Sequence, residues 1–257
     1  MTQATEKGHV KVSIDNLGIA TIEFGHPLSN SLPGKILRKL ADSITEFSKS
    51  KETKVIILKS EGDKTFCAGA SFDELISIDD IESGEVFFSG FANVINACRK
   101  SEKLIIGRVQ GKAVGGGVGI AAAVDYCFAT KKAAIKLSEL AIGIGPFVVG
   151  PAIERKIGLS AMSQLAINAT EWRSASWANT KGLYTDLYDD DMEMDSAIDI
   201  LSKQLALYNP EAMRKLKEVF WEGTDHWDII LKDRAEISGT LVLSDFTKNA
   251  INSFKKK

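Results

Sequence analysis

The sequence predicts an α/β fold that opens with antiparallel strands and ends in helices. Apolar and polar residues alternate over 10–14 and 19–24 around the turn at 16–18, a pattern that predicts a β-hairpin. Between the hairpin and about Pro146, short apolar segments alternate with amphipathic ones, and beyond Pro146 the pattern becomes almost wholly helical. Because we find no convincing linker, we expect one compact body with a helical C-terminal part.

The central elements follow from periodicity. A helix is predicted after Pro33, and strands are predicted at 55–58 and 104–109, where short continuous apolar runs indicate burial on both faces. A helix at 81–100 separates these two strands, and two further short strands lie between 126 and 137. The apolar positions of the first helix recur at helical spacing: Ile36, Leu37, Leu40, Ile44 and Phe47.

The composition favours a soluble globular protein without a strong global charge. Of 257 residues, 44% are apolar and 26% charged, and 32 basic side chains face 34 acidic ones, so no positive field favours nucleic acid or an anionic membrane. The polar N-terminus resembles neither a signal nor a transit peptide, and no apolar run is long enough to span a bilayer. Three cysteines without CxxC spacing favour a reducing compartment. We therefore expect a cytoplasmic protein.

Two loops rich in small residues are candidate sites for an anion or an oxyanion. The segment 66–70, Phe-Cys-Ala-Gly-Ala, follows a predicted strand, and its small residues leave backbone amides uncovered. Gly115, Gly116 and Gly117 follow the strand at 104–109 and lie at a predicted helix start, where N–H groups point outward. Taken alone, the first loop also fits an ordinary strand-to-helix turn. The second loop matches neither the Walker A nor the dinucleotide fingerprint.

Two amide-donating loops that follow strands of one sheet are able to converge on a single oxygen, as an oxyanion hole requires. Such a site needs an acid or base nearby. Glu139 follows the last predicted strand and precedes a glycine-rich loop, where apolar walls would hold its carboxylate. An isolated glutamate is more often a surface residue, so Glu139 gains weight only beside the two loops.

In order and spacing, these three elements resemble those of the crotonase (enoyl-CoA hydratase/isomerase) superfamily: the FCAGA loop, the GGG helix start and the segment Ser-Glu-Leu-Ala-Ile-Gly at 138–143. The resemblance extends from the hairpin to the final helices, and its finer detail is similar to the methylglutaconyl-CoA hydratase branch. It implies a spiral of ββα units over 1–191 and a helical trimerisation region over 192–257. It also implies a homotrimer or homohexamer that acts on an acyl-CoA thioester.

The resemblance also implies roles for individual residues. The amides of Ala70 and Gly116 would hold the thioester oxygen, and Glu139 would transfer protons. The main chain of Ala68 would meet the adenine of CoA, with Phe66 and Cys67 in the same loop. CoA would be part of the substrate, so no separate cofactor is expected.

One position departs from the hydratase pattern. Hydratases of the family use two glutamates, and the position of the first is Gly119 in this chain. The resemblance implies a hydratase, with a single-glutamate enoyl-CoA isomerase as the alternative. Asp73 or Glu74, on the helix expected after the first loop, would be candidates to supply the missing acid.

Two other classes of function, a non-catalytic acyl-CoA binder and an RNA-binding protein, are kept as alternatives. A carboxylate beside an oxyanion hole argues against the first, and the near-neutral charge gives the second no support. No metal is expected, because His9, His26 and His226 lack metal-ligand spacing. The four tryptophans of the helical half are interpreted as core or subunit-interface residues, and the interface is the preferred interpretation.

Overall fold

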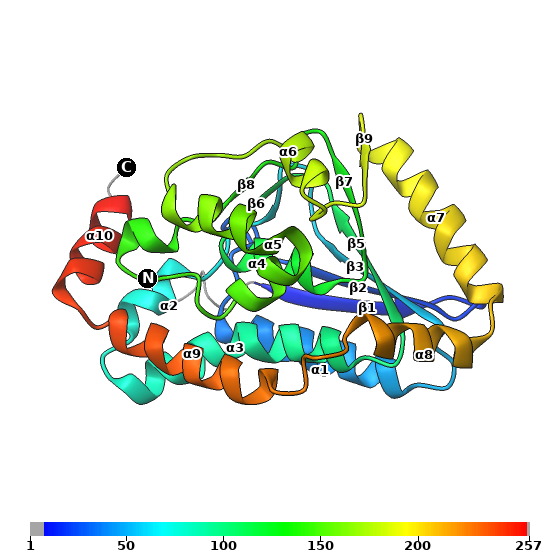
Figure 1. Cartoon of the computed structure of the whole chain (residues 1–257), viewed down its shortest axis with the longest axis horizontal. Helices are drawn as coiled ribbons and strands as arrows, with labels where there is room; N and C mark the ends of the chain where they lie inside the picture. Colours follow the sequence, from blue (N-terminus) through cyan, green and yellow to red (C-terminus); the bar gives the residue numbers. More distant parts are fainter. Residues whose placement is uncertain (1–7, 256–257) are drawn as a thin grey trace.

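The computed structural model of the protein describes residues 8–255, which form two sheets surrounded by helices (Figure 1). In chain order the elements of this part are β1 (His9–Ile14), β2 (Ile19–Gly25), α1 (Gly34–Lys49), β3 (Val55–Ser60), β4 (Thr65–Cys67), α2 (Phe72–Ser77), α3 (Ile81–Lys100), β5 (Leu104–Val109), β6 (Lys112–Val114), α4 (Gly116–Ala123), β7 (Tyr126–Thr130), β8 (Ile135–Lys136), the 3-10 helix η1 (Glu139–Ile142), α5 (Gly150–Ile167), α6 (Ala175–Thr180), β9 (Asp186–Tyr188), α7 (Asp191–Leu207), α8 (Pro210–Phe220), α9 (Trp227–Leu241) and α10 (Asp245–Lys255).

The larger sheet has the order β1-β2-β3-β5-β7-β9, and the smaller one has the order β4-β6-β8. β1 and β2 pair antiparallel, which confirms the predicted hairpin, and every other pairing is parallel. The predicted α/β core and the helices at 81–100 and 116–123 are also confirmed. In the small sheet, each strand leads directly into one of the three segments that the sequence singles out.

Both faces of the large sheet are covered. On one face, the main core joins Ile22 of β2 to the inward sides of α1 and α3, such as the buried Leu37 and Ile95. α7 covers the other face. On that second face, Met194 and Ile198 of α7 join a cluster with Val55 and Ile106 of β3 and β5. Burial on both faces explains why β3 and β5 are apolar along most of their length.

The helices after residue 191 pack on the rest of the same chain. α9 lies along α3 (Figure 1), and their backbones meet at Gly84 and Gly239, where a Cβ on Gly84 would lie 2.7 Å from the Cα of Gly239. Trp221 and Trp227 are buried, with their ring centroids 5.9 Å apart in an edge-to-face contact. These two tryptophans are therefore core residues. The use of this region for subunit contacts stays a prediction.

The acidic stretch at 186–195 contains a short strand followed by the entry to α7, which begins at Asp191 after the cap residue Asp190. Its first residues form β9, which extends the large sheet by pairing parallel with β7. The hydroxyl of Tyr126 donates to Asp186 Oδ2 at 2.7 Å, which gives this acid a partner at the sheet edge. Local composition could not reveal this strand, because its pairing partner lies about sixty residues earlier in the chain.

Cys67, Cys98 and Cys127 are all buried and free. Burial raises the pKa of each thiol to about 12, so all three stay protonated at neutral pH. Within residues 8–255, no helix combines the length and the apolar character that crossing a membrane demands.

Candidate active site

The two predicted amide loops lie against each other. β4 leads into Gly69, which has a φ of +87°, and β6 leads into Gly115, which has a φ of +52°. Both values favour glycine, because a side chain is strained in this region. A Cβ on Gly69 would lie 2.9 Å from the carbonyl oxygen of Val114 and 3.6 Å from the amide nitrogen of Gly116. Pairing of β4 with β6 brings the loops together.

Two amides in these loops are available as donors. Within the described residues, neither the N–H of Ala70 nor that of Gly116 donates a hydrogen bond, whereas the residues that precede them, Gly69 and Gly115, both donate. The N–H of Ala68 donates to the carbonyl of Ser29 at 3.1 Å, and Gly69 donates to Cys67 Sγ at 3.3 Å. Gly116 is the first residue of α4, so its N–H is one that the helix itself leaves without an acceptor.

The carboxylate of Glu139 lies beside the second loop. Glu139 begins η1, directly after β8 and Ser138. A Cβ on Gly115 would lie 2.8 Å from Glu139 Oε1, so the carboxylate packs against the turn that precedes Gly116. Pairing of β6 with β8 fixes this neighbourhood, because the two strands end side by side.

Glu139 has an unusual electrostatic environment. Its Oε2 atom is buried and has no hydrogen-bond partner among the described residues, although part of the residue is accessible through the cavity. Burial raises the pKa of Glu139 to about 7, and a hydrogen bond from its own backbone N–H offsets only part of that rise. At neutral pH the protonated and ionised forms are therefore both populated, which suits a group that accepts and returns a proton.

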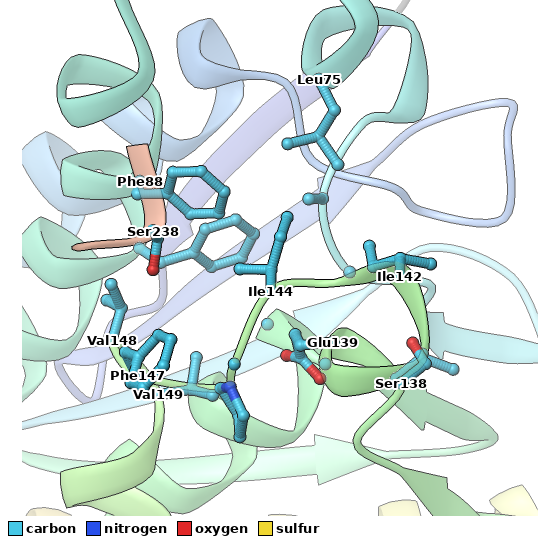
Figure 2. A pocket seen from close by; sticks show the side chains of 18 of the residues that line it. Leu75, Phe88, Ser138, Glu139, Ile142, Ile144, Phe147, Val148, Val149 and Ser238 are labelled. Carbon is cyan, nitrogen blue, oxygen red and sulfur yellow. The ribbon is translucent and has the colours of Figure 1, made fainter. Parts of the chain in front are cut away.

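The Ala70 and Gly116 loops and Glu139 line one cavity, whose other walls are mostly apolar (Figure 2). Its lining residues are Ala68, Gly69, Ala70, Phe72, Leu75, Phe88, Phe91, Val114, Gly115, Gly116, Ser138, Glu139, Ile142, Ile144, Gly145, Pro146, Phe147, Val148, Val149 and Ser238. Among them Glu139 is the one titratable side chain. The structure thus brings together three of the predicted site residues, Ala70, Gly116 and Glu139.

The position expected for a second glutamate faces an apolar wall. Gly119 lies within α4, and a Cβ there would fall 2.6 Å from the Cβ of Val149. Val149 is 5% exposed and lines the cavity. Any side chain at position 119 would therefore require Val149 to move.

Asp73 and Glu74 lie outside the cavity lining, in the first turn of α2. Glu74 Oε2 accepts a hydrogen bond from the N–H of Gly34 at 2.7 Å, at the start of α1. This contact holds the Glu74 carboxylate at the N-terminus of α1, where its negative charge also complements the helix dipole. The geometry thus gives Glu74 a structural task away from Glu139.

Of the residues expected at CoA, Ala68 lines the cavity, while Phe66 and Cys67 do not. Phe66 is 1% exposed and packs edge to face against Phe24 at a centroid distance of 5.4 Å. Cys67 is fully buried. The side chains of Phe66 and Cys67 therefore support the loop from beneath, and the loop lines the cavity with Ala68, Gly69 and Ala70.

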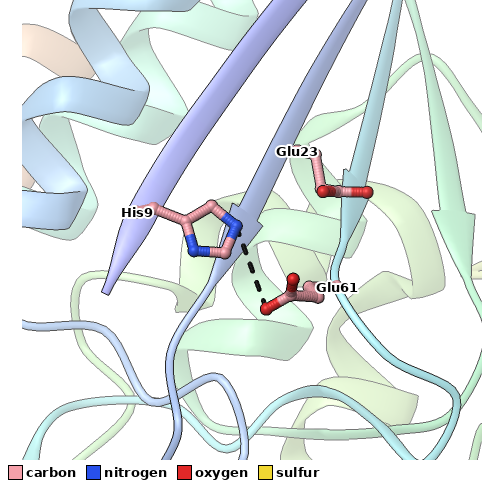
Figure 3. Close-up of side chains that lie close together, drawn as sticks. All are labelled: His9, Glu23 and Glu61. Carbon is pink, nitrogen blue, oxygen red and sulfur yellow. Dashed lines mark ion pairs between the residues drawn. The ribbon is translucent and has the colours of Figure 1, made fainter. Parts of the chain in front are cut away.

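One group of possible metal ligands lies elsewhere, on β1, β2 and the end of β3 (Figure 3). Ligand atoms of His9, Glu23 and Glu61 lie within 4.8 Å of one another. Two lysines already pair with these acids: Lys11 Nζ lies 3.5 Å from Glu23 and 3.3 Å from Glu61, and Lys59 Nζ lies 3.0 Å from Glu23. Since the lysines balance both carboxylates, this chemistry favours an ion-pair network over a metal centre. His26 and His226 are not members of the group.

The sequence did not predict the wall of the cavity that is formed by α3, α9 and the segment before α5. Phe88 and Phe91 come from α3, Ser238 from α9, and Phe147 and Val149 from the segment that leads into α5. These residues are far apart in the chain and belong to no motif. Only the helical spacing of Phe88 and Phe91 marked an apolar face, and nothing in it indicated a ligand.

Comparisons with known proteins agree with this geometry. The family model described as enoyl-CoA hydratase/isomerase matches residues 15–251. The chain is 25% identical over 250 residues to a probable enoyl-CoA hydratase of Bacillus subtilis, covering 96% of each chain. It is 28% identical over 217 residues to the mitochondrial methylglutaconyl-CoA hydratase of Mus musculus, covering 82% of this chain and 68% of the relative.

Among solved structures, enoyl-CoA hydratase from Bacillus halodurans is similar, with a TM-score of 0.86 at 19% identity, covering 95% of this chain and 99% of that one. At this identity the likeness supports the fold alone. The family match, by contrast, spans the chain from the hairpin turn through both amide loops and Glu139 into α10. The chain therefore belongs to the enoyl-CoA hydratase/isomerase family of the crotonase superfamily.

Proposed function

We propose that this protein shifts the double bond of an enoyl-CoA thioester and that Glu139 is its single proton-transfer residue. The observation that carries the proposal is the isolation of Glu139: it is the one titratable side chain among the lining residues, and it lies beside two unused amides. A single carboxylate with a pKa near 7 suffices to take a proton from one carbon and return it to another.

In the proposed mechanism, the thioester oxygen accepts hydrogen bonds from the N–H groups of Ala70 and Gly116. Ionised Glu139 removes a proton from the carbon next to the thioester of a 3-enoyl substrate, and the electron pair moves onto the oxygen as a dienolate. The two amides stabilise that negative charge. Protonated Glu139 then delivers the proton to the fourth carbon, the double bond moves to position 2, and Glu139 is ionised again.

Hydration is the second candidate, favoured by the printed names of the relatives, which include enoyl-CoA and methylglutaconyl-CoA hydratases. Adding water across the double bond requires a group that activates the water as well as one that protonates carbon. Gly119 supplies no such group, and Val149 fills the space in front of it. This apolar wall makes double-bond migration the better-supported reaction.

A non-catalytic role fits the cavity less well. Burying Glu139 without a cation or a hydrogen bond to its Oε2 atom destabilises the ionised form, and a binding protein gains nothing from that cost. The formal net charge of −2 gives RNA binding no support. Enzymatic use explains why an unpaired acid persists at this position.

The same proposal extends to the CoA and to the assembly. The main chain of Ala68 at the cavity is proposed to meet the adenine, and CoA is proposed to arrive as part of the substrate.

We also propose a trimer, or a dimer of trimers, that uses the helices after residue 192. Exposed apolar side chains on α8, including Leu216, Val219 and Phe220, support a subunit contact there. The buried, protonated thiols fit the proposed cytoplasmic location.

The test is to incubate the protein separately with 2-enoyl-CoA and 3-enoyl-CoA thioesters in water enriched in ¹⁸O. Products are then identified by mass and chromatographic retention. We expect conversion between the 2- and 3-enoyl forms without change of mass. A product heavier by one water, carrying ¹⁸O and formed faster than the isomer, would replace isomerisation with hydration as the function.

A further inference from the structure

The acyl group has one direction in which to extend. With its oxygen at Ala70 and Gly116, the thioester would have its charged nucleotide toward solvent, because burying phosphates is costly. The acyl group would then enter the side of the cavity that α3 and α9 close. In Figure 2, Phe88, Phe147, Val148 and Ser238 all lie on the side of Glu139 away from Ser138.

This inner side is apolar and well buried. Phe88 is 9% exposed, Phe91 4% and Val148 4%, so aromatic and aliphatic carbon forms most of its surface. Ser238 is 1% exposed, but its hydroxyl already donates to the carbonyl of Arg234 at 3.0 Å. The hydroxyl hydrogen of Ser238 is therefore used within α9 and is not donated into the cavity.

The inner side also lacks a positive charge. No lysine, arginine or histidine is found among the described residues that line the cavity. Arg234 is close to this side, since its Nη1 atom donates to the carbonyl of Phe147 at 3.3 Å, but it is not among the residues that line the cavity. The one charged group that faces the cavity is Glu139, which is negative when it acts as a base.

We infer that the acyl subsite selects uncharged, apolar acyl chains and rejects chains that end in a carboxylate. This inference rests on the proposed function, since it takes the cavity as an acyl-CoA site. A terminal carboxylate would lose its hydration, find no cation or free donor side chain, and approach the like charge of Glu139. A methyl group at the same place would instead bury its surface against Phe88 and Val148.

The test compares pentanoyl-CoA with glutaryl-CoA, two saturated five-carbon thioesters that differ in a terminal methyl or carboxylate group. Neither has a double bond to shift or hydrate, so equilibrium titration of the wild-type protein measures binding without turnover. We expect glutaryl-CoA to bind at least about 100-fold more weakly than pentanoyl-CoA. In Glu139→Gln, where the repulsion is absent, about 10-fold discrimination should remain from desolvation.

A variant at Phe147 tests the missing cation directly. Phe147 is only partly buried and lies in a loop, so a long side chain is tolerable there. Phe147→Lys should improve glutaryl-CoA binding relative to pentanoyl-CoA by about 10-fold or more, because it places a positive charge at the inner wall. Phe147→Leu is the matched control, which changes shape without charge and should keep the wild-type preference.

The outcomes separate this inference from the proposed function. Tighter binding of pentanoyl-CoA than of free CoA, together with rejection of glutaryl-CoA, supports both. Equal or tighter binding of glutaryl-CoA by the wild-type protein overturns the inference and leaves the acyl-CoA site standing. If neither thioester binds more tightly than free CoA, the acyl-CoA site and the inference are both wrong.

Discussion

Two acidic side chains, Asp125 and Glu139, are largely removed from water in this protein, and their surroundings are opposite. The side chain of Asp125, just after α4, is 5% exposed and accepts hydrogen bonds from Lys217 Nζ at 2.7 Å, Trp221 Nε1 at 3.0 Å and the N–H of Ile105 at 2.7 Å. Glu139 has an Oε2 atom without a partner and no cation among the residues that line its cavity.

This difference indicates that Asp125 has a structural role and that Glu139 is suited to proton transfer. Lys217 is itself 2% exposed, so its pair with Asp125 ties α8 to the start of β5. Three donors hold the Asp125 carboxylate in place, so its oxygens are already used in packing the structure. Glu139 lacks that stabilisation, and its pKa of about 7 leaves it free to change protonation state during a reaction. The hydrogen-bond and ion-pair partners of a buried carboxylate, more than its burial, therefore determine whether its role is structural or chemical.

Breaking the Asp125 pair should produce the largest change in stability. Lys217→Met leaves a buried carboxylate without its cation, and such a loss typically lowers the free energy of unfolding by about 3–5 kcal/mol. Lys215→Met is the matched control on the same helix, because Lys215 is 61% exposed and pairs with Glu218 at the surface. We expect the control to lose less than about 1 kcal/mol in urea unfolding. Equal losses in both variants would show that the buried pair has no special weight.

Removing the unpartnered acid should have the opposite sign. Because the pKa of Glu139 is raised on folding, its ionisation destabilises the folded state as pH rises from about 4.5 to about 7, and the penalty is complete above pH 7. Glu139→Gln should therefore be more stable than the parent at pH 8, by about 1–3 kcal/mol, with the gain shrinking toward pH 4.5. Urea titrations at pH 5 and pH 8 measure both values. A loss of stability at pH 8 would contradict the account.

Removing one of the hydrogen bonds that Asp125 accepts should have the smallest effect on stability, and it would separate the weight of this bond from that of the charge pair. Trp221→Phe keeps the ring near Trp227 but removes the Nε1 hydrogen bond, so the free energy of unfolding should fall by about 1–2 kcal/mol. Thermal or urea unfolding measures this change. A loss as large as that of Lys217→Met would mean that ring packing, rather than the charge pair, carries this region.

Much of the fold was predictable because its signals are local. The hairpin, the helix at Ile81–Lys100 and the strand at Leu104–Val109 follow from alternation, helical spacing and apolar runs within single segments. β9 was not predictable in this way: its three residues carry little periodicity, and its identity as a strand depends on pairing with β7. Trp221 and Trp227 were expected at a subunit interface in preference to the core, and only the packing of the chain shows that they are core residues.

The candidate site was predictable where it depends on backbone and order along the chain. Ala70, Gly116 and Glu139 each follow a strand of the small sheet, so their proximity follows once those strands pair in parallel. The partner of Gly119 was not predictable, because Val149 lies thirty residues later and meets it only through the packing of α4 on α5. Side-chain contacts of this kind leave no local pattern.

The central claim, that Glu139 alone moves the proton, is tested most directly by deuterium exchange. Wild-type protein, Glu139→Gln and the control Glu74→Gln are incubated with 3-hexenoyl-CoA in D₂O, and deuterium entering the acyl chain is followed by mass. We predict that Glu139→Gln exchanges at least about 100-fold more slowly while it binds the thioester as the parent does, and that Glu74→Gln stays near the parental rate. Parental exchange by a folded Glu139→Gln protein would contradict the account.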